Sequence, residues 1–220
     1  MDGFIDRADG GRRLAEALRH YEGRPDTLVL ALPRGGVPVG YEVARTLDLP
    51  LDVFLVRKLG VPGHEELAMG AIASGDVLVL NPDVVVAMRI PAYVIDAAAA
   101  REKPELERRA REYRNGRPEP DIRGHTVILV DDGLATGSTM RAAVSAVRRH
   151  GAGRIVVAVP VASQEAAAEF KLDVDEFVCL LTPAWFAAVG EWYEDFSQTT
   201  DEEVKDLLER AAREHAGHVH

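Results

Sequence analysis

Short hydrophobic runs alternate along most of the chain with amphipathic stretches of helical period. Runs of consecutive β-favouring residues, such as 127–130, are typical of strands buried on both faces of a parallel sheet. Strands are predicted at residues 27–32, 51–56, 68–73, 77–80, 126–130, 154–160 and 175–181. Helices are predicted at residues 9–21, 37–47, 138–150, 163–171 and 201–214. This alternation predicts an α/β fold of three layers, in which helices cover a doubly wound, mainly parallel sheet.

The segment 82–123 interrupts the alternation with a stretch rich in arginine and glutamate. Its apolar stripe is narrow, and Pro104 is expected to begin or kink a helix there. Seven basic and four acidic residues fall within 101–117. We interpret this stretch as a solvated helix with i,i+4 ion pairs and take no site residue from it. The alternative is a flap that carries positive charge towards a substrate.

Length and composition fit one domain. Of the 220 residues, 47% are hydrophobic, which allows a sizeable core. We predict a single domain over residues 1–220, with a helical insertion at about 82–123 and a small hood and tail at about 182–220.

Charge and hydropathy exclude two classes of partner. The formal net charge is −10, whereas broad nucleic-acid binding needs positive charge, so no nucleic-acid partner is expected. No stretch approaches the roughly 18–20 apolar residues of a membrane span, and the N-terminus lacks a basic region followed by an apolar one. The sequence therefore predicts a cytoplasmic protein without membrane contact. Cys179 is the single cysteine and lies in an apolar run, which favours a core residue over a catalytic thiol.

Residues 127–139 carry the most informative chemistry of the chain. A buried strand leads into Asp131 and Asp132, and ligands of open α/β sheets bind beyond the carboxyl ends of strands. Gly133 and Gly137 let the backbone curl tightly before a helix begins. The helix start offers free N–H groups to an anion, beside the hydroxyls of Thr136, Ser138 and Thr139. The order predicts a sugar-phosphate site, although a strand, an Asp N-cap and a helix occur in any α/β protein.

Two commoner phosphate loops do not fit this spacing. A Walker A loop needs four residues between its glycines followed by lysine, but Gly133 and Gly137 bracket three residues and no lysine follows. The dinucleotide pattern G-x-G-x-x-G follows none of the predicted strands. A P-loop nucleotidase and a nicotinamide enzyme are therefore not expected.

The run 127–139 resembles the phosphoribosyl-pyrophosphate (PRPP) binding motif of the type I phosphoribosyltransferases. Its two hydrophobic residues, two acids and T-G-S-T ending carry the resemblance. The resemblance implies that Asp131 and Asp132 act in catalysis by holding the ribose hydroxyls. It also implies that they hold Mg²⁺, mainly through water or PRPP hydroxyls. The residues that it assigns to the 5′-phosphate are Ala135, Thr136, Gly137, Ser138 and Thr139.

A second segment, residues 28–40, again reads as strand, loop and helix and resembles the family's first phosphate loop. The resemblance implies that Arg34, Gly35 and Gly36 bind the pyrophosphate group. Arginine suits this role because its planar fork matches phosphate oxygens. Taken alone, Pro-Arg-Gly-Gly is also typical of a surface turn.

A third segment, residues 56–71, resembles the mobile active-site loop of the family. Its glycines and proline break regular structure, and its charges suit closure over a polyanion. The resemblance implies that Arg57 and Lys58 are catalytic residues. The other charged residues of the loop are equally consistent with ordinary surface chemistry.

The C-terminal aromatic residues resemble, more loosely, the base-recognising hood of the hypoxanthine-guanine branch. Trp192 and Tyr193 are the base-binding candidates because an aromatic ring can stack on a flat base. Core packing and a dimer contact are equally open for them. Ala135 departs from that branch, which places a carboxylate there, so a proton acceptor must come from elsewhere or the base must enter as its anion.

The resemblance implies a Mg²⁺-dependent phosphoribosyltransferase of nucleotide salvage. It would transfer the 5-phosphoribosyl group from PRPP to a nucleobase, with a purine favoured, and release pyrophosphate. The partners expected are PRPP and a nucleobase, with a homodimer left open. The alternative is a non-catalytic PRPP- or nucleotide-binding regulatory protein, although only about 26 residues precede the first predicted strand.

Overall fold

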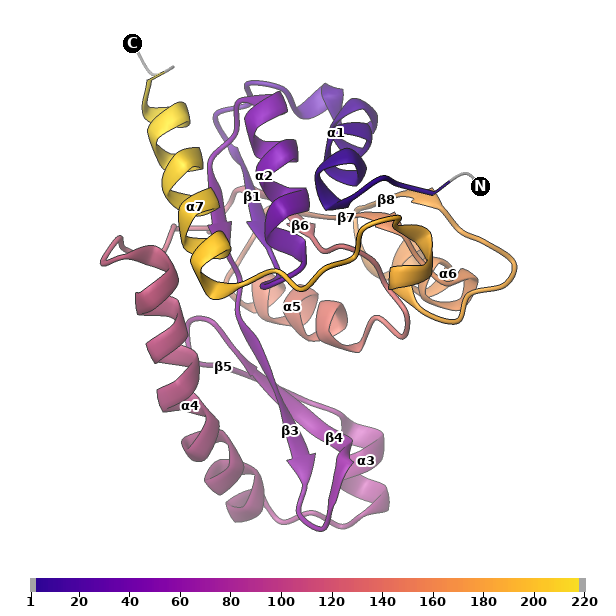
Figure 1. Cartoon of the computed structure of the whole chain (residues 1–220). Coiled ribbons are helices and arrows are strands. Elements are labelled where there is room, and N and C mark those ends of the chain that lie inside the picture. Colours follow the sequence, from indigo (N-terminus) through magenta and orange to yellow (C-terminus); the bar gives the residue numbers. More distant parts are fainter. Residues whose placement is uncertain (1–2, 218–220) are drawn as a thin grey trace.

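The computed structural model describes residues 3–217 and has a five-stranded parallel sheet at its centre (Figure 1). The strand order is β2-β1-β6-β7-β8. The strands are β1 (Thr27–Ala31), β2 (Leu51–Val53), β6 (Thr126–Val130), β7 (Arg154–Val161) and β8 (Glu176–Leu181). Every residue of β1 and β6 is buried, as expected for central strands covered on both faces.

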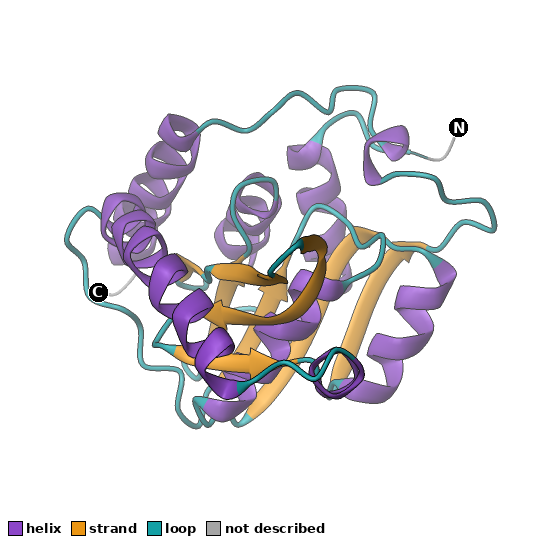
Figure 2. Ribbon diagram, turned by 90° about the horizontal axis from the view of Figure 1, so that it is seen from below, coloured by secondary structure: helices purple, strands orange, loops and turns teal. Residues whose placement is uncertain are grey.

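Helices cover both faces of this sheet, which confirms the predicted doubly wound α/β fold (Figure 2). Side chains alternate along β1, so Val29 and Ala31 face one core cluster and Leu28 and Leu30 face the other. The first cluster packs against α1 (Arg7–Ala17), α2 (Gly36–Leu47) and α7 (Asp201–Ala216). The second packs against α5 (Ser138–Arg149) and α6 (Gln164–Asp173).

A second sheet, antiparallel and in the order β3-β4-β5, lies below the main one in Figure 1. Its strands are β3 (Val56–Val61), β4 (His64–Ala73) and β5 (Val77–Leu80). The helices α3 (Pro82–Ala87) and α4 (Ala92–Arg114) follow in the chain. Contacts of the sheet with both α4 and α5 join it to the rest of the molecule.

The predicted strand at 68–73 lies within β4, but the expectation that glycines and proline break regular structure before it is wrong for most of the segment, which forms the β3–β4 hairpin. Only Pro62 and Gly63 form the turn, where Gly63 has a φ of +82°, and Gly60 lies within β3. Leu59, Val61 and Met69 are buried beneath the hairpin, and this apolar face outweighs the local turn signals.

One helix expectation also differs from the structure. Helix α4 begins at Ala92, not at Pro104, and continues through the proline. Helix α7 has the predicted start, and Val204 and Leu208 are fully buried where it packs on α2 and α4. Between β8 and α7 the chain forms a loop with the 3-10 helix Val189–Trp192. Phe4 pairs with this region, since its N–H donates to the Trp192 carbonyl oxygen at 2.8 Å.

Candidate functional site

The two loops predicted to bind phosphate groups meet at the carboxyl edge of the main sheet. Strands β1 and β6 are paired in parallel, with Ala31 opposite Val130, so their loops emerge side by side. A Cβ atom on Gly36 would lie 2.8 Å from the Val130 carbonyl oxygen, and one on Gly35 would overlap the Asp132 carboxylate. The backbone of the first loop thus packs directly on the acids of the second.

Asp131 and Asp132 follow β6 and are held by backbone and side-chain contacts. The Asp132 N–H donates to Asp131 Oδ1 at 2.9 Å. Burial, followed by the nearby charge of Asp132, raises the pKa of Asp131 well above its usual range. Burial also raises the pKa of Asp132, and an ion pair with Arg7 opposes the rise. Two adjacent, largely buried carboxylates form a site that favours hydroxyl donors or a cation.

Arg7 is the main contact of this site that the sequence did not indicate. It lies at the start of α1, and its Nε donates to Asp132 Oδ2 at 2.8 Å. Its Nη1 donates to the Ser197 carbonyl oxygen at 2.7 Å, and its guanidinium lies 3.9 Å from the centre of the Phe196 ring. No local motif surrounds Arg7, and its partner is 125 residues away in the chain.

The loop predicted to bind the 5′-phosphate leads into α5 and leaves its first turn accessible. Ala135 and Thr136 are exposed, and Ser138 and Thr139 are half-buried. Gly137 is the N-cap residue with a φ of +70°, and a Cβ atom there would lie 2.6 Å from the Phe170 ring. Glycine offers no side chain to cap the helix, so the N-terminal N–H groups are suited to an anion.

Arg34 stands half-buried in the first loop, after a cis peptide bond between Pro33 and Arg34. Its charge reaches the Tyr113 hydroxyl on α4. Burial and a hydrogen bond to Asp201 raise the pKa of Tyr113, and the charges of Arg109 and Arg34 oppose the rise. The charge of Arg34 is thus close enough to the Tyr113 hydroxyl to affect its pKa.

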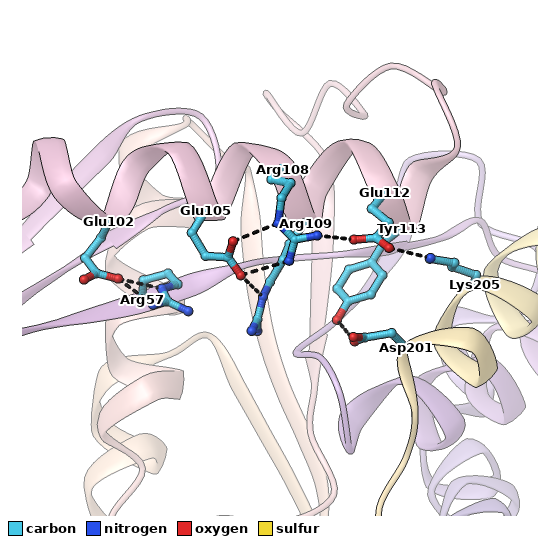
Figure 3. Close-up of polar contacts among 9 residues, drawn as sticks. All are labelled: Arg57, Glu102, Glu105, Arg108, Arg109, Glu112, Tyr113, Asp201 and Lys205. Carbon is cyan, nitrogen blue, oxygen red and sulfur yellow. Dashed lines mark hydrogen bonds and ion pairs between the residues drawn. The ribbon is translucent and has the colours of Figure 1, made fainter.

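Arg57 and Lys58, the two residues of β3 predicted to be catalytic, have different surroundings in the structure. Arg57 on β3 forms an ion pair with Glu102 of α4, with nitrogen–oxygen distances of 2.5 and 2.9 Å (Figure 3). Lys58 is the next residue of the strand and so points to the opposite face. It lines a cavity of about 320 Å³ together with Ser138 and Arg141 of α5. Lys58 is thus near the 5′-phosphate loop, whereas Arg57 is tied to the insertion helix.

The i,i+4 ion pairs predicted for the insertion are present along α4, although the helix also buries Leu106 and Tyr113. Arg109 pairs with Glu105, and Arg108 pairs with both Glu105 and Glu112 (Figure 3). Glu112 also accepts a hydrogen bond from Lys205 of α7 at 2.6 Å. These contacts hold the basic side chains along the helix and join it to the main body.

The two residues predicted to bind the base lie in the hood but differ in surroundings. Tyr193 is 6% exposed, and its ring contacts the rings of Phe4 and Phe196. Its hydroxyl donates to the Asp132 carbonyl oxygen at 2.5 Å, so in this structure Tyr193 supports the loop that carries Asp131 and Asp132. Trp192 is half-buried, and its indole nitrogen has no hydrogen-bond partner in the described part of the chain. A base-binding role for either residue remains a prediction.

Removal of the Tyr193 hydroxyl should destabilise the protein. Burial raises the pKa of Tyr193 far above the ordinary range, so the hydroxyl remains a donor at neutral pH. The Tyr193→Phe variant leaves the Asp132 carbonyl oxygen without this donor and should lose about 1–3 kcal/mol of unfolding free energy. Urea denaturation measures the loss, with Tyr93→Phe as the control because Tyr93 is 73% exposed. Equal stability of the two variants would contradict the prediction.

Cys179 should be unreactive in the folded protein. Burial raises its pKa to about 11, and its thiol donates to the Leu181 carbonyl oxygen at 3.2 Å. Because only the thiolate reacts, alkylation by iodoacetamide at pH 8 should be about 100-fold slower than in urea-unfolded protein. The rate for the folded protein should rise as the pH approaches 11. A fast reaction at pH 8 would show an activated thiol instead.

Two kinds of feature are absent from the described residues. None of the helices in residues 3–217 is long and apolar enough to span a membrane. No group of three or more His, Cys, Asp or Glu residues in that range is arranged to hold a metal ion.

Three comparisons, with protein-family models, with curated proteins and with solved structures, each match most of the chain. The family model for the phosphoribosyl transferase domain matches residues 6–195. Two Mycobacterium tuberculosis proteins, from strains CDC 1551 and H37Rv, carry the provisional name of phosphoribosyl transferase and are 49% identical over 213 residues. The match covers 97% of this chain, which spans about half the length (48%) of those relatives. The crystal structure of TT1426 from Thermus thermophilus is similar, with a TM-score of 0.83 and 48% identity over 94% of this chain and 97% of that one.

Proposed function

Because this chain belongs to the phosphoribosyl transferase domain family, we propose that it transfers the 5-phosphoribosyl group of PRPP to a nucleobase. Pyrophosphate is the leaving group, and a purine is the favoured acceptor. The observation that carries the proposal is the junction of the two phosphate loops. Gly35 of the first loop packs on Asp132 of the second, so a pyrophosphate and a ribose bound at these loops would be neighbours.

The proposed roles follow from what each part of the site offers chemically. The N–H groups and hydroxyls of residues 135–139 bind the 5′-phosphate at the start of α5. Asp131 and Asp132 accept hydrogen bonds from the ribose hydroxyls, and their negative charge stabilises positive charge that develops on the ribose ring. Arg34 and the backbone of Gly35 and Gly36 receive the departing pyrophosphate.

Residues 131 and 132 also suit a magnesium ion. The site offers two adjacent carboxylates and no larger cluster of metal-binding side chains among the described residues. Mg²⁺ is usually held by one or two carboxylates together with substrate phosphates and water, so this donor set fits. When bound, the ion would neutralise negative charge on the pyrophosphate. Asp131 and Asp132 would hold it, mainly through water or the PRPP hydroxyls.

The acceptor is the less determined half of the proposed reaction. Ala135 brings no carboxylate to the second loop, and its carbonyl oxygen accepts a hydrogen bond from Ser163 Oγ at 2.7 Å. We propose that the base enters as its anion or loses its proton to a group outside this loop. Lys58, across the cavity from Ser138, is the proposed catalytic residue of the hairpin, and Arg57 can act only after leaving Glu102.

The test is pyrophosphate release from PRPP and Mg²⁺ with adenine, hypoxanthine, guanine, xanthine, uracil and orotate supplied separately. A base-free reaction is the control. Release that depends on one base supports the transferase and identifies its substrate. PRPP binding without release on any base would favour the regulatory alternative. The absence of PRPP binding would contradict the transferase and would leave only a nucleotide-binding regulator. Size-exclusion chromatography with light scattering determines whether the protein is a homodimer, which the sequence leaves open.

A further inference from the structure

Arg7 is held in the site by three contacts from two segments of the chain, the second loop and residues 196–197. Its nitrogens donate to Asp132 of the second loop and to the Ser197 carbonyl oxygen, and its flat face covers the Phe196 ring. The Arg7 side chain is only 12% exposed, and that of Asp132 is 15% exposed. A guanidinium with two directed hydrogen bonds and one covered face has little freedom to reorient.

The other arginines of α1 are more exposed, and their carboxylate partners lie outside the site. The Arg12 and Arg13 side chains are both 50% exposed and pair with Asp9 on the same helix. Arg12 also approaches the Glu42 carboxylate on α2 at 3.9 Å. The position of Arg7 is therefore not explained by general pairing along a charged helix.

The ion pair of Arg7 and Asp132 also lies directly against the first phosphate loop. A Cβ atom on Gly35 would overlap Asp132 Oδ2 and would lie 3.3 Å from Arg7 Nε. One oxygen of the carboxylate is thus fixed by Arg7 beside the loop backbone. Without Arg7, the carboxylate would have no directional partner at Oδ2 among the contacts that the structure describes.

We propose that Arg7 is a positioning residue for the ribose of the substrate, an inference that rests on the proposed function. Arg7 binds Asp132 Oδ2 and thereby orients the carboxylate so that Oδ1 meets the ribose hydroxyls. Phe196 and the Ser197 carbonyl oxygen keep the guanidinium in place. The N-terminal helix and the segment after the hood thus cooperate to shape a site whose recognisable motif lies in the middle of the chain.

Calorimetric titration of Arg7→Gln with ribose 5-phosphate and, separately, with inorganic pyrophosphate tests the proposal. The affinity for ribose 5-phosphate should fall about 10-fold, as is common when a group that orients a ligand is removed. The affinity for pyrophosphate should not change, because Arg7 acts through Asp132. Arg12→Gln is the matched control, since it removes the same charge from the same helix outside the site, and it should bind both ligands like the wild type.

Two further variants separate positioning from a structural role. Arg7→Lys keeps the charge but not the planar fork, so it should recover only part of the ribose 5-phosphate affinity. Phe196→Leu keeps Arg7 and removes the ring beneath it, and should lower the affinity for ribose 5-phosphate about 2- to 5-fold. Melting temperatures are measured for each variant. If the role of Arg7 is merely structural, its variants should have a lower melting temperature and a lower affinity for both ribose 5-phosphate and pyrophosphate.

The outcomes that overturn the proposal are distinct from failure of the proposed function. Wild-type affinity of Arg7→Gln for ribose 5-phosphate would remove the role of Arg7 and leave the transferase proposal intact. A loss of pyrophosphate affinity would also overturn it, because that effect does not pass through the ribose. If the wild type binds neither PRPP nor ribose 5-phosphate, the proposed function fails and the role of Arg7 fails with it.

Discussion

Replacement of Asp132 by asparagine is expected to lower the rate of pyrophosphate release about 100-fold or more. The substitution keeps the size of the side chain but removes a carboxylate placed where positive charge would develop on the ribose. Loss of one such electrostatic group commonly costs about 100- to 1,000-fold in rate. The measurement is steady-state kinetics with PRPP and the accepted base, together with the dissociation constant of PRPP from calorimetry.

The stability of Asp132→Asn should change much less than its activity. Removing one partner of a buried ion pair typically costs about 3–5 kcal/mol when the other charge is left alone. In Asp132→Asn the Arg7 charge would still have the Asp131 carboxylate close by, since the charge of Arg7 already lowers the pKa of Asp131. Asp206→Asn is the control, because it removes the same charge from a side chain that is 65% exposed on α7. Unchanged kinetics in a folded Asp132→Asn variant would remove the ribose role of this residue.

The parts of the site that could be predicted from the sequence are those formed by consecutive residues of the chain. The run 127–130 is apolar at every position because β6 is covered on both faces, and the acids and glycines of its loop follow directly. The same holds for β1 and the loop 33–36. Parallel pairing of adjacent strands then brings the two loops together without any further information.

Contacts between distant segments could not be predicted in this way. Arg7 looks like any arginine of an amphipathic helix until the fold places it on Asp132, 125 residues away. The hairpin β3–β4 cannot be predicted for a different reason, because Gly60, Pro62 and Gly63 indicate a loop when burial is unknown. Tyr193 was recognised as an aromatic of the hood, but its hydrogen bond to the Asp132 backbone depends on the folded hood.

Replacement of Gly35 by alanine is expected to abolish most activity through a single added methyl group. Gly35 has a φ of −60°, which alanine adopts without backbone strain, so only the added Cβ atom matters. That atom would overlap Asp132 Oδ2 and lie 2.8 Å from Asp132 Cγ, and it would also crowd Arg7 Nε at 3.3 Å. The first loop and the acid must move apart. A misplacement of about 1 Å in a reacting assembly can cost about 100-fold in rate, and we expect at least that loss.

The Gly35→Ala variant should nevertheless fold, because overpacking at one position costs about 1–3 kcal/mol. Gly217→Ala is the matched control, since Gly217 has a φ of −74° and its added Cβ atom would lie 3.4 Å from the nearest atom, the Glu214 carbonyl oxygen. The control should retain wild-type kinetics. Pyrophosphate release and urea denaturation are measured on both variants. Wild-type turnover in Gly35→Ala would mean that the contact between the first loop and Asp132 is not needed for the reaction, because the methyl group cannot be accommodated without breaking that contact.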